Sequence, residues 1–346
     1  MDPEQSWHFH RVDNPHDAEA IEPHLAVCDP HHHLWDQKWG HYGPYGPADL
    51  VFDTTRGHKV LQTVFVECDV SYRKRGPVEF RSVGETQFAA ASAERVVNLG
   101  GPPIAGIVGA VNLTRHQDLD RMIDAHEEAA QGRLRGFRLR AAWDPHDAYG
   151  FPGVGSGLLS EPTIKASVRS MAQRGLVLDL VVLFHQLLET VDLAVAAPNT
   201  KIVLDHLAYP LGVGIYADRA AEVDAEWRRK IRVVAKLPNV YMKLGGLGMW
   251  MLGGGWQEGN APVSSDEIVD RFGSRIAFLI EEFGPERCMF ESNFPVDGTA
   301  FGYVTCWNAF KKMSRQYSMA DRRFLLRDTA IDVYRLPAAP EEAGKP

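Results

Sequence analysis

The chain has 346 residues, of which 45% are hydrophobic and 24% are charged, and this composition is typical of a globular protein with a large core. The formal net charge is −8 without long basic runs, which argues against nucleic acid or an anionic membrane as the main partner. No apolar run reaches the roughly 18 residues of a membrane span, and the N-terminus does not resemble a signal peptide. We therefore expect a cytoplasmic protein that acts on a small molecule, and the composition leaves a homo-oligomer open.

Eight short apolar runs recur along the chain, and segments with helical apolar spacing separate most of them. The runs cover 24–30, 60–68, 103–113, 134–140, 175–182, 201–208, 239–246 and 287–294. Helical spacing is clear in 160–175, 224–239 and 265–284. Strands that alternate with helices imply a parallel sheet, and eight of them fit a closed (β/α)8 TIM barrel, an α/β fold, better than an open sheet. We expect one such domain over residues 1–346.

Three segments rich in glycine, proline and aromatic residues follow expected strands, at about 36–58, 207–220 and 245–265. In a (β/α)8 barrel the loops that follow the strands surround the active face. The third segment, which includes Trp250 among glycines, is interpreted as a lid that excludes water. A packed surface loop is the alternative.

Histidines end three of the expected strands. The first strand ends in CDPHHHLWD, and alternation places His31 and His33 on one side and His32 on the other. His185 and His206 follow the fifth and sixth strands. Packing rarely requires imidazole, whereas two imidazoles at a barrel mouth can share a metal ion or a substrate oxygen. The pattern predicts a catalytic site.

The eighth expected strand ends in FESNFPVD. Alternation points Glu291 and Asn293 to the same side, with Glu291 one inward step deeper. Both side chains are therefore expected to lie with the histidines.

Six pieces of the chain carry a family resemblance: DPHHHLWD, FVECDVSYR, RGFRLR, VLDHLAYPLG, NVYMKLGGLGM and RCMFESNFPVDG. Together they resemble the amidohydrolase superfamily, and more narrowly its amidohydrolase-2 branch near 2-pyrone-4,6-dicarboxylate lactonase and fuconolactonase. The resemblance implies an amidohydrolase-type barrel in which His31, His33, His185 and His206 face the reacting carbonyl.

One departure concerns the general base. Much of the superfamily has an aspartate at the end of the eighth strand, where this chain has Asn293. An amide has no useful basicity and is a weak metal ligand. Glu291 is the first candidate to replace the aspartate. The other two are Asp297, expected on a more solvated loop, and a histidine. If a histidine is the base, Asn293 would orient the water or donate a hydrogen bond to the developing oxyanion, and loss of activity is a further alternative.

The resemblance leaves the metal question open. Relatives near the lactonases work without a tightly held metal, whereas decarboxylases and other branches use one divalent ion on the His-x-His pair. If zinc or manganese is bound, His31, His33 and His185 are the expected ligands. A metal-free mechanism is equally compatible with the sequence.

Basic and aromatic residues near the expected strand ends are candidates for substrate contacts. Guanidinium groups at a barrel mouth can hold a carboxylate in a bidentate manner. Arg138 is the strongest candidate, because an inward charge on a barrel strand requires a partner, and Glu67 is its expected protein partner. The full set of candidates is Tyr72, Arg73, Arg138, Arg140, Trp143, Lys243 and Trp250.

The sequence therefore favours a lactonase-like hydrolase that opens a small carboxylated or hydroxylated lactone, ester or amide. Water would attack a carbonyl polarised by the histidine cluster. A non-redox decarboxylase of the same fold, with or without a metal, is the nearest alternative. A catalytically silent barrel that binds a ligand is the other.

Overall fold

Eight parallel strands form one sheet in the order β1 to β8 in a computed structural model of the chain, which describes residues 19–40, 42–146, 149–151, 153–256 and 263–338. The strands are β1 (Val27–His32), β2 (Val60–Val66), β3 (Ile104–Gly109), β4 (Leu134–Arg140), β5 (Val177–Val181), β6 (Ile202–Leu204), β7 (Val240–Leu244) and β8 (Cys288–Phe290). A parallel bridge between His32 and Phe294 joins the segment after β8 to β1. The expected (β/α)8 barrel is confirmed.

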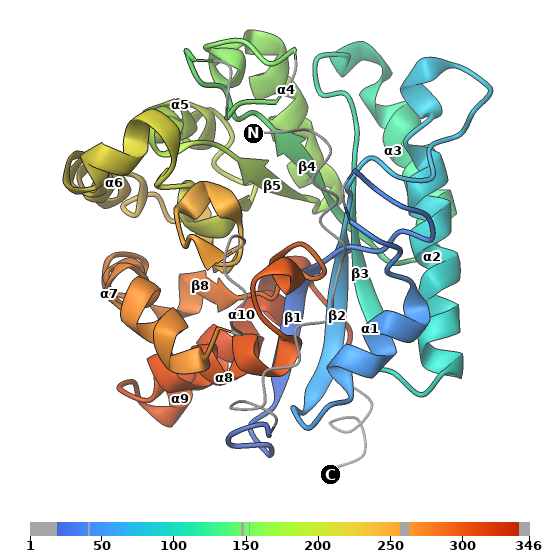
Figure 1. Ribbon diagram of the computed structural model, residues 1–346. Helices are drawn as coiled ribbons and strands as arrows, with labels where there is room; N and C mark the ends of the chain where they lie inside the picture. Colours follow the sequence, from blue (N-terminus) through green and yellow to red (C-terminus); the bar gives the residue numbers. More distant parts are fainter. Residues whose placement is uncertain (1–18, 41, 147–148, 152, 257–262, 339–346) are drawn as a thin grey trace.

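The helices form a ring around the strands (Figure 1). They are α1 (Pro47–Thr54), α2 (Val83–Asn98), α3 (Leu119–Ala130), α4 (Pro162–Met171), α5 (Leu187–Ala196), α6 (Ala220–Val234), α7 (Ser265–Phe283), α8 (Tyr303–Ser314), α9 (Met319–Arg323) and α10 (Thr329–Tyr334). The start of α7 shows the local cause: the Ser264 hydroxyl accepts the Glu267 N–H, and the Glu267 carboxylate accepts the Ser264 N–H in return. Within the described residues, no helix combines the length and the apolar character needed to cross a membrane.

The described residues of the three insertions form local structure, and two of the insertions contact one another. The first contains α1, and an antiparallel bridge joins Trp35 to Tyr45. The second and third contact each other, because the Gly212 N–H donates to the Met251 carbonyl at 2.9 Å. Residues 257–262 of the third insertion lie outside the described residues. The described part of this segment is thus a loop packed on its neighbour, and its interpretation as a lid stays a prediction.

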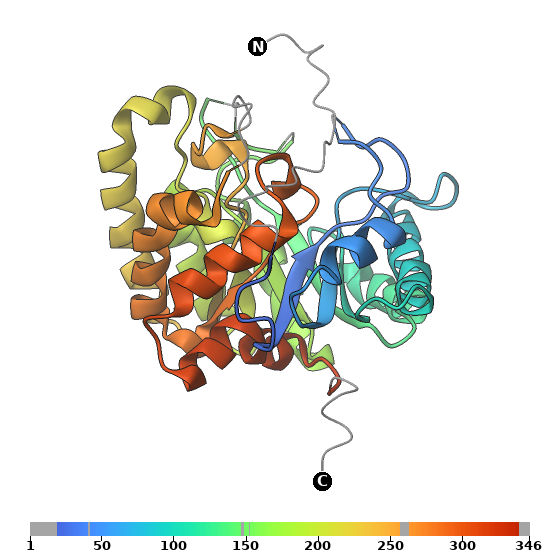
Figure 2. The same ribbon diagram turned by 60° about the horizontal axis from the view of Figure 1, so that its bottom comes forward.

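The interior of the barrel has an apolar lower layer that α10 closes. Inward residues of six strands pack with Val333 and Tyr334 of α10; they are Cys28, Val64, Val108, Val177, Val203 and Met289. Figure 2 shows the last helices (red) at the lower end of the barrel, away from the loops that follow the strands. Because inward side chains recur every second residue, the next inward positions lie one layer closer to those loops.

Candidate active site

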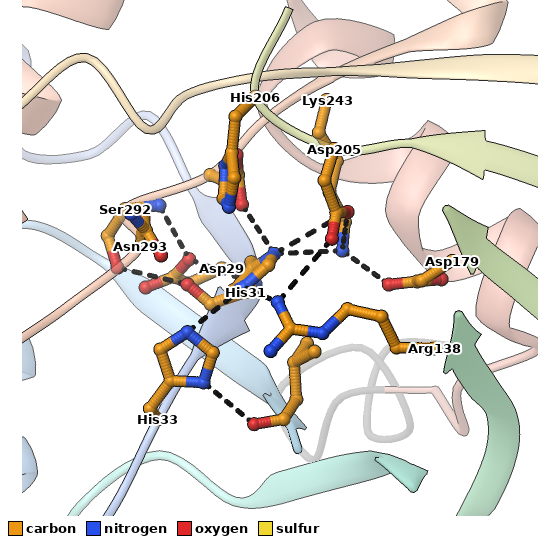
Figure 3. A network of polar contacts seen from close by, with 12 residues as sticks. Asp29, His31, His33, Arg138, Asp179, Asp205, His206, Lys243, Ser292 and Asn293 are labelled. Carbon is orange, nitrogen blue, oxygen red and sulfur yellow. Dashed lines mark hydrogen bonds and ion pairs between the residues drawn. The ribbon is translucent and has the colours of Figure 1, made fainter. Parts of the chain in front are cut away.

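A layer of ionisable side chains lies directly above the apolar layer. We call it the charged layer, and its members are His31, Arg138, Asp179, Asp205, Lys243 and Glu291. Alternation explains its origin, since Asp179 follows inward Val177, and Asp205 follows inward Val203, by two residues. Apart from Arg138, whose side chain is 7% exposed, these side chains are fully buried. Figure 3 shows His31 at the centre of the group.

Lys243 connects four strands at the base of this layer. Its ammonium lies 2.6 Å from Asp179 Oδ2, 3.1 Å from Asp205 Oδ1 and 3.1 Å from His31 Nδ1. Tyr334 Oη donates to both carboxylate oxygens of Asp179, at 2.9 and 3.0 Å. Burial lowers the pKa of Lys243, but Asp179 and Asp205 raise it more, so the ammonium stays charged. Lys243 was expected to bind substrate, and the structure places it beneath the histidines instead.

His31 and His33 face one another, while His32 points elsewhere. Their Nε2 atoms are 3.2 Å apart, and His33 Nδ1 lies 2.8 Å from the Val66 carbonyl oxygen. The His32 ring contacts Thr63 Oγ1 at 3.0 Å. Burial, reinforced by Lys243 for His31 and by Arg138 for both rings, lowers the pKa of His31 and His33 well below the usual range. Both rings are therefore neutral.

His206 forms a different pair, with Glu291. His206 Nδ1 lies 2.5 Å from Glu291 Oε1, so the neutral ring carries its proton on Nδ1 and keeps a lone pair on Nε2. Burial lowers the pKa of His206, but the Glu291 carboxylate raises it more, and the net shift is upward. The arrangement is that of a histidine base oriented by a carboxylate.

The backbone around His206 is adapted to this position. Residues 206–209 all have positive φ, with 53° at His206. Such strain in non-glycine residues persists only where the surroundings hold it, and it gathers at functional sites. A Cβ atom at Gly246 would lie 2.6 Å from His206 Cγ, so the second glycine of the KLGG sequence makes room for the ring.

Asn293 holds an aspartate in place. It has a φ of 54°, a conformation that asparagine tolerates, and its Nδ2 donates to Asp297 Oδ1 at 2.8 Å. Asp297 Oδ2 accepts the Gly248 N–H at 2.9 Å. Asp297 is 1% exposed, and burial raises its pKa to about 7. The expectation of a solvated Asp297 was wrong, because the loop after β7 folds over it.

His185 lies apart from the other three histidines. Its Nε2 is 3.2 Å from Asp144 Oδ2, and Tyr216 Oη donates to the same oxygen at 2.6 Å. Trp143 contacts the His185 ring edge-on, with centroids 6.2 Å apart. His185 remains partly exposed. The structure thus joins His31, His33 and His206 in one cluster and places His185 in a neighbouring aromatic group.

An open cleft of about 320 Å³ reaches the charged layer from the side of β2, β3 and β4. Arg138, Arg140, Glu67 and Tyr72 are among its lining residues. Arg138 Nε donates to Glu67 Oε1 at 2.7 Å, and its Nη1 lies 3.5 Å from His31 Nε2. Glu67 is the expected partner of Arg138, and Arg138 is the residue that both lines the cleft and contacts the histidine cluster.

Three of the remaining substrate candidates, Arg73, Trp143 and Trp250, do not line this cleft. Arg73 is exposed and donates to Gln87, whereas Trp250 is 45% exposed and lies near Tyr149, with ring centroids 6.1 Å apart. Trp143 belongs to the His185 group described above. Arg138, Arg140 and Tyr72 therefore line the cleft, whereas Arg73 and the two tryptophans do not.

Sequence reasoning missed Asp179 and Asp205 as parts of the site. Each is a single acidic residue at an inward position of an apolar run, VLDLVV or KIVLDH. That pattern was a usable signal, because a buried carboxylate requires a partner. The partner of both is Lys243, which no local pattern identifies.

Whether this cluster fits a metal ion depends on what already occupies its ligand atoms. Among the described residues, His31, Asp205 and His206 can bring one ligand atom each within 4.8 Å of the others. The 3.2 Å between the Nε2 atoms of His31 and His33 is also close to the separation of about 3.3 Å between two ligands of tetrahedral zinc. By donor type alone the cluster is suitable.

Fixed cations argue against such an ion. Lys243 and Arg138 lie 3.1 and 3.6 Å from the two carboxylate oxygens of Asp205, and they also approach the two ring nitrogens of His31. A divalent ion about 4 Å from one of these cations would meet a repulsion of about 8 kcal/mol at an effective dielectric constant of 20. In this arrangement the oxygens of Asp205 and the ring nitrogens of His31 already contact Lys243 and Arg138, and a divalent ion would have to displace these cations.

Comparisons with known proteins identify the family. A family model described as Amidohydrolase (Amidohydro_2) matches residues 28–336. An uncharacterized protein, y4mH, of Sinorhizobium fredii is 30% identical over 334 residues, which cover 90% of this chain and 99% of that protein. L-fucono-1,5-lactonase of Burkholderia multivorans is 27% identical over 235 residues, or 68% of this chain and 72% of the lactonase.

The fold comparison agrees. A crystal structure of an amidohydrolase from Burkholderia multivorans with bound zinc superposes with a TM-score of 0.70 at 22% identity, covering 90% of this chain and 100% of that chain. At this identity the likeness shows the fold alone. Together with the family match over residues 28–336, it shows that the chain belongs to the amidohydrolase family of (β/α)8 barrels.

Proposed function

We propose that this protein hydrolyses a small, neutral, polyhydroxylated lactone without a divalent ion, with His206 as the general base. The observation that carries the proposal is the cleft: it opens onto Arg138 beside the histidine cluster, and its arginines are already paired with carboxylates. The name of the related L-fucono-1,5-lactonase is consistent with a sugar lactone.

The charge balance of the cleft favours a neutral substrate. Arg115 is 2.7 Å from Asp118, Arg138 is 2.7 Å from Glu67, and Arg140 binds Glu67 and Asp69. A substrate carboxylate would have to compete with these partners and approach their negative charges. Sugar hydroxyls both donate and accept, so they can bind guanidinium and carboxylate groups together. The hydroxylated alternative is therefore preferred over the carboxylated one.

The proposed hydrolysis uses the two groups that flank His31, which are His206 and Arg138. His206 Nε2 takes a proton from water, and the resulting hydroxide forms a bond to the lactone carbonyl carbon. Arg138 donates hydrogen bonds to the developing oxyanion. The ring C–O bond then breaks, and the proton on His206 passes to the leaving alkoxide, which gives a hydroxy acid. Glu291 keeps the His206 ring oriented throughout.

A lactone panel tests this proposal. Metal-free protein, prepared by chelation and checked by elemental analysis, is mixed with neutral sugar lactones and with carboxylated lactones, and acid release is followed with a pH dye. We expect turnover of one or more neutral lactones. His206→Gln should lower kcat on the order of a hundredfold or more. His58→Gln changes a buried histidine that precedes β2 and contacts Lys311 of α8, and should leave kcat unchanged.

Four outcomes would contradict the proposal. A preference for carboxylated lactones would overturn the substrate class. Release of carbon dioxide from an aromatic acid would favour the decarboxylase, and thermal shifts without product would favour a silent barrel. Activity that requires added zinc or manganese would refute the metal-free mechanism.

A further inference from the structure

We propose that Lys243 is a positioning residue that fixes the tautomer of His31, and thereby leaves His206 as the histidine of the cluster with a free lone pair. The proposal deepens the proposed function and rests on it for its kinetic part. Its structural part concerns a chain of hydrogen bonds that can be observed without any substrate.

This series of hydrogen bonds begins at Lys243, whose ammonium group can only donate. An ammonium has no acceptor, so the 3.1 Å contact from Lys243 Nζ to His31 Nδ1 requires a lone pair on that nitrogen. A neutral imidazole with a lone pair on Nδ1 carries its proton on Nε2. The His31 proton therefore points at His33 Nε2, 3.2 Å away.

The other end of the hydrogen-bond series, at Val66, independently gives the same direction of donation. The Val66 carbonyl can only accept, so His33 donates from Nδ1 across 2.8 Å, and its Nε2 holds the lone pair. That lone pair receives the proton of His31 Nε2. The sequence of donors runs from Lys243 to His31, to His33 and to Val66, with no nitrogen left free in either ring.

A competing arrangement involves Glu291. Its Oε2 lies 2.8 Å from His31 Nδ1 and would accept a hydrogen bond if Nδ1 carried a proton, either in the Nδ1–H tautomer or in an imidazolium. Arg138 Nη1 could donate to Nε2 in the Nδ1–H tautomer, but its 3.5 Å contact is longer than the 3.2 Å from Nε2 to His33. In the described structure Glu291 Oε2 has no hydrogen-bond partner, in agreement with a lone pair on Nδ1. Lys243 is the group that keeps this position unprotonated, because its charge opposes a second positive charge on the ring.

Lys243 is itself held rigidly. It makes three short contacts with three acceptors, which matches the three donors of an ammonium. Asp179 is anchored by Tyr334 of α10, and Lys243 Nζ also lies 5.5 Å from the centroid of the Tyr334 ring. The position of the ammonium is therefore set by the lower end of the barrel and does not depend on a bound substrate.

The test reads the tautomer directly. Protein labelled with 15N in its histidines is studied by long-range 1H–15N NMR, and the His31 signals are assigned from a His31→Gln spectrum. We expect the Nε2–H tautomer in the wild type and its loss in Lys243→Met. Lys311→Met is the matched control: Lys311 is also fully buried but donates to the Ile21 and Glu22 carbonyls, so the His31 signals should not change.

The kinetic readout separates positioning from binding. Lys243→Met should lower kcat about 10- to 100-fold with KM little changed, while Lys311→Met should keep kcat. An Nδ1–H tautomer or an imidazolium at His31 in the wild type would overturn the proposal, as would an unchanged tautomer in Lys243→Met. The wild-type spectrum decides even if the variant does not fold. Inactivity towards lactones with the expected spectrum would refute the proposed function alone.

Discussion

In the proposed mechanism, His206 and Glu291 take the role that an aspartate at position 293 would have. Where a superfamily aspartate would be expected to activate water, this chain has an amide that donates to Asp297. Glu291 instead accepts a hydrogen bond from Nδ1 of His206, the ring nitrogen opposite to Nε2. In the proposed mechanism the general base is thus the histidine after the sixth strand, with Glu291 as its orienting partner, and no longer a residue of the eighth.

The pH dependence of Glu291→Gln tests this assignment. His206 acts as a base only when unprotonated, so kcat/KM should rise with pH through its pKa, which Glu291 raises. Removing the carboxylate charge lowers that pKa, so the acidic limb of the profile should move to lower pH. The maximum rate should fall on the order of a hundredfold because the ring loses its orientation. An acidic limb that stays in place would show that the titrating base is another group, such as Asp297.

At the scale of elements, α10 does more than close the barrel. It contributes apolar side chains to the lower layer and, through Tyr334, a hydrogen-bond donor to the charged layer. The helix has six residues and follows directly on the π-helical segment Phe324–Asp328. Its position at the lower end means that the C-terminal part of the chain supports the site from below.

Tyr334→Phe separates the hydroxyl from the ring. The variant keeps the packing but leaves Asp179 with one donor fewer, so unfolding free energy should fall by about 1–3 kcal/mol. Activity should fall as well, because Lys243 loses its anchored partner. Tyr303→Phe is the control, since Tyr303 donates to buried Asp29 at 3.0 Å, outside the charged layer. Denaturant unfolding and kcat would be measured on both, and equal kcat values for the two variants would contradict a link from α10 to the site.

For the whole molecule, the relevant quantity is the balance of charge. The chain has a net charge of −8, yet the arginines of the cleft are compensated locally by carboxylates. Long-range attraction of an anionic substrate is therefore absent, and the surface would repel one. A neutral substrate would be neither attracted nor repelled by the net charge.

The salt dependence of kcat/KM checks this balance. For a neutral lactone, kcat/KM should stay constant between about 50 mM and about 500 mM sodium chloride, because screening acts only on charged partners. A carboxylated lactone serves as the comparison, and its kcat/KM should increase with salt as repulsion is screened. A steep decrease with salt for the preferred substrate would mean that the cleft attracts anions.

The sequence alone determined the fold and the main histidine cluster. Eight apolar runs separated by helical periods predict the barrel, because strand and helix periodicities are local properties. Alternation within CDPHHHLWD and FESNFPVD correctly gave the side on which His31, His33 and Glu291 lie, since a strand fixes the direction of each side chain from its neighbours. The cluster with His206 follows from the rule that parallel strands end at one face.

Only the tertiary structure decided how these groups are paired. Asp297 was expected in solvent and is buried because the loop after β7, far from it in sequence, folds over it. His185 ends the expected strand like the other histidines, but a 3-10 turn, Phe184–Gln186, carries it toward Asp144. Lys243 was expected to contact the substrate, but it lies at the base of the site. Its depth in the barrel depends on the stagger of β7 against β5 and β6. Electrostatic pairing depends on distances across the barrel, and those distances are set by the closed sheet and not by any single segment.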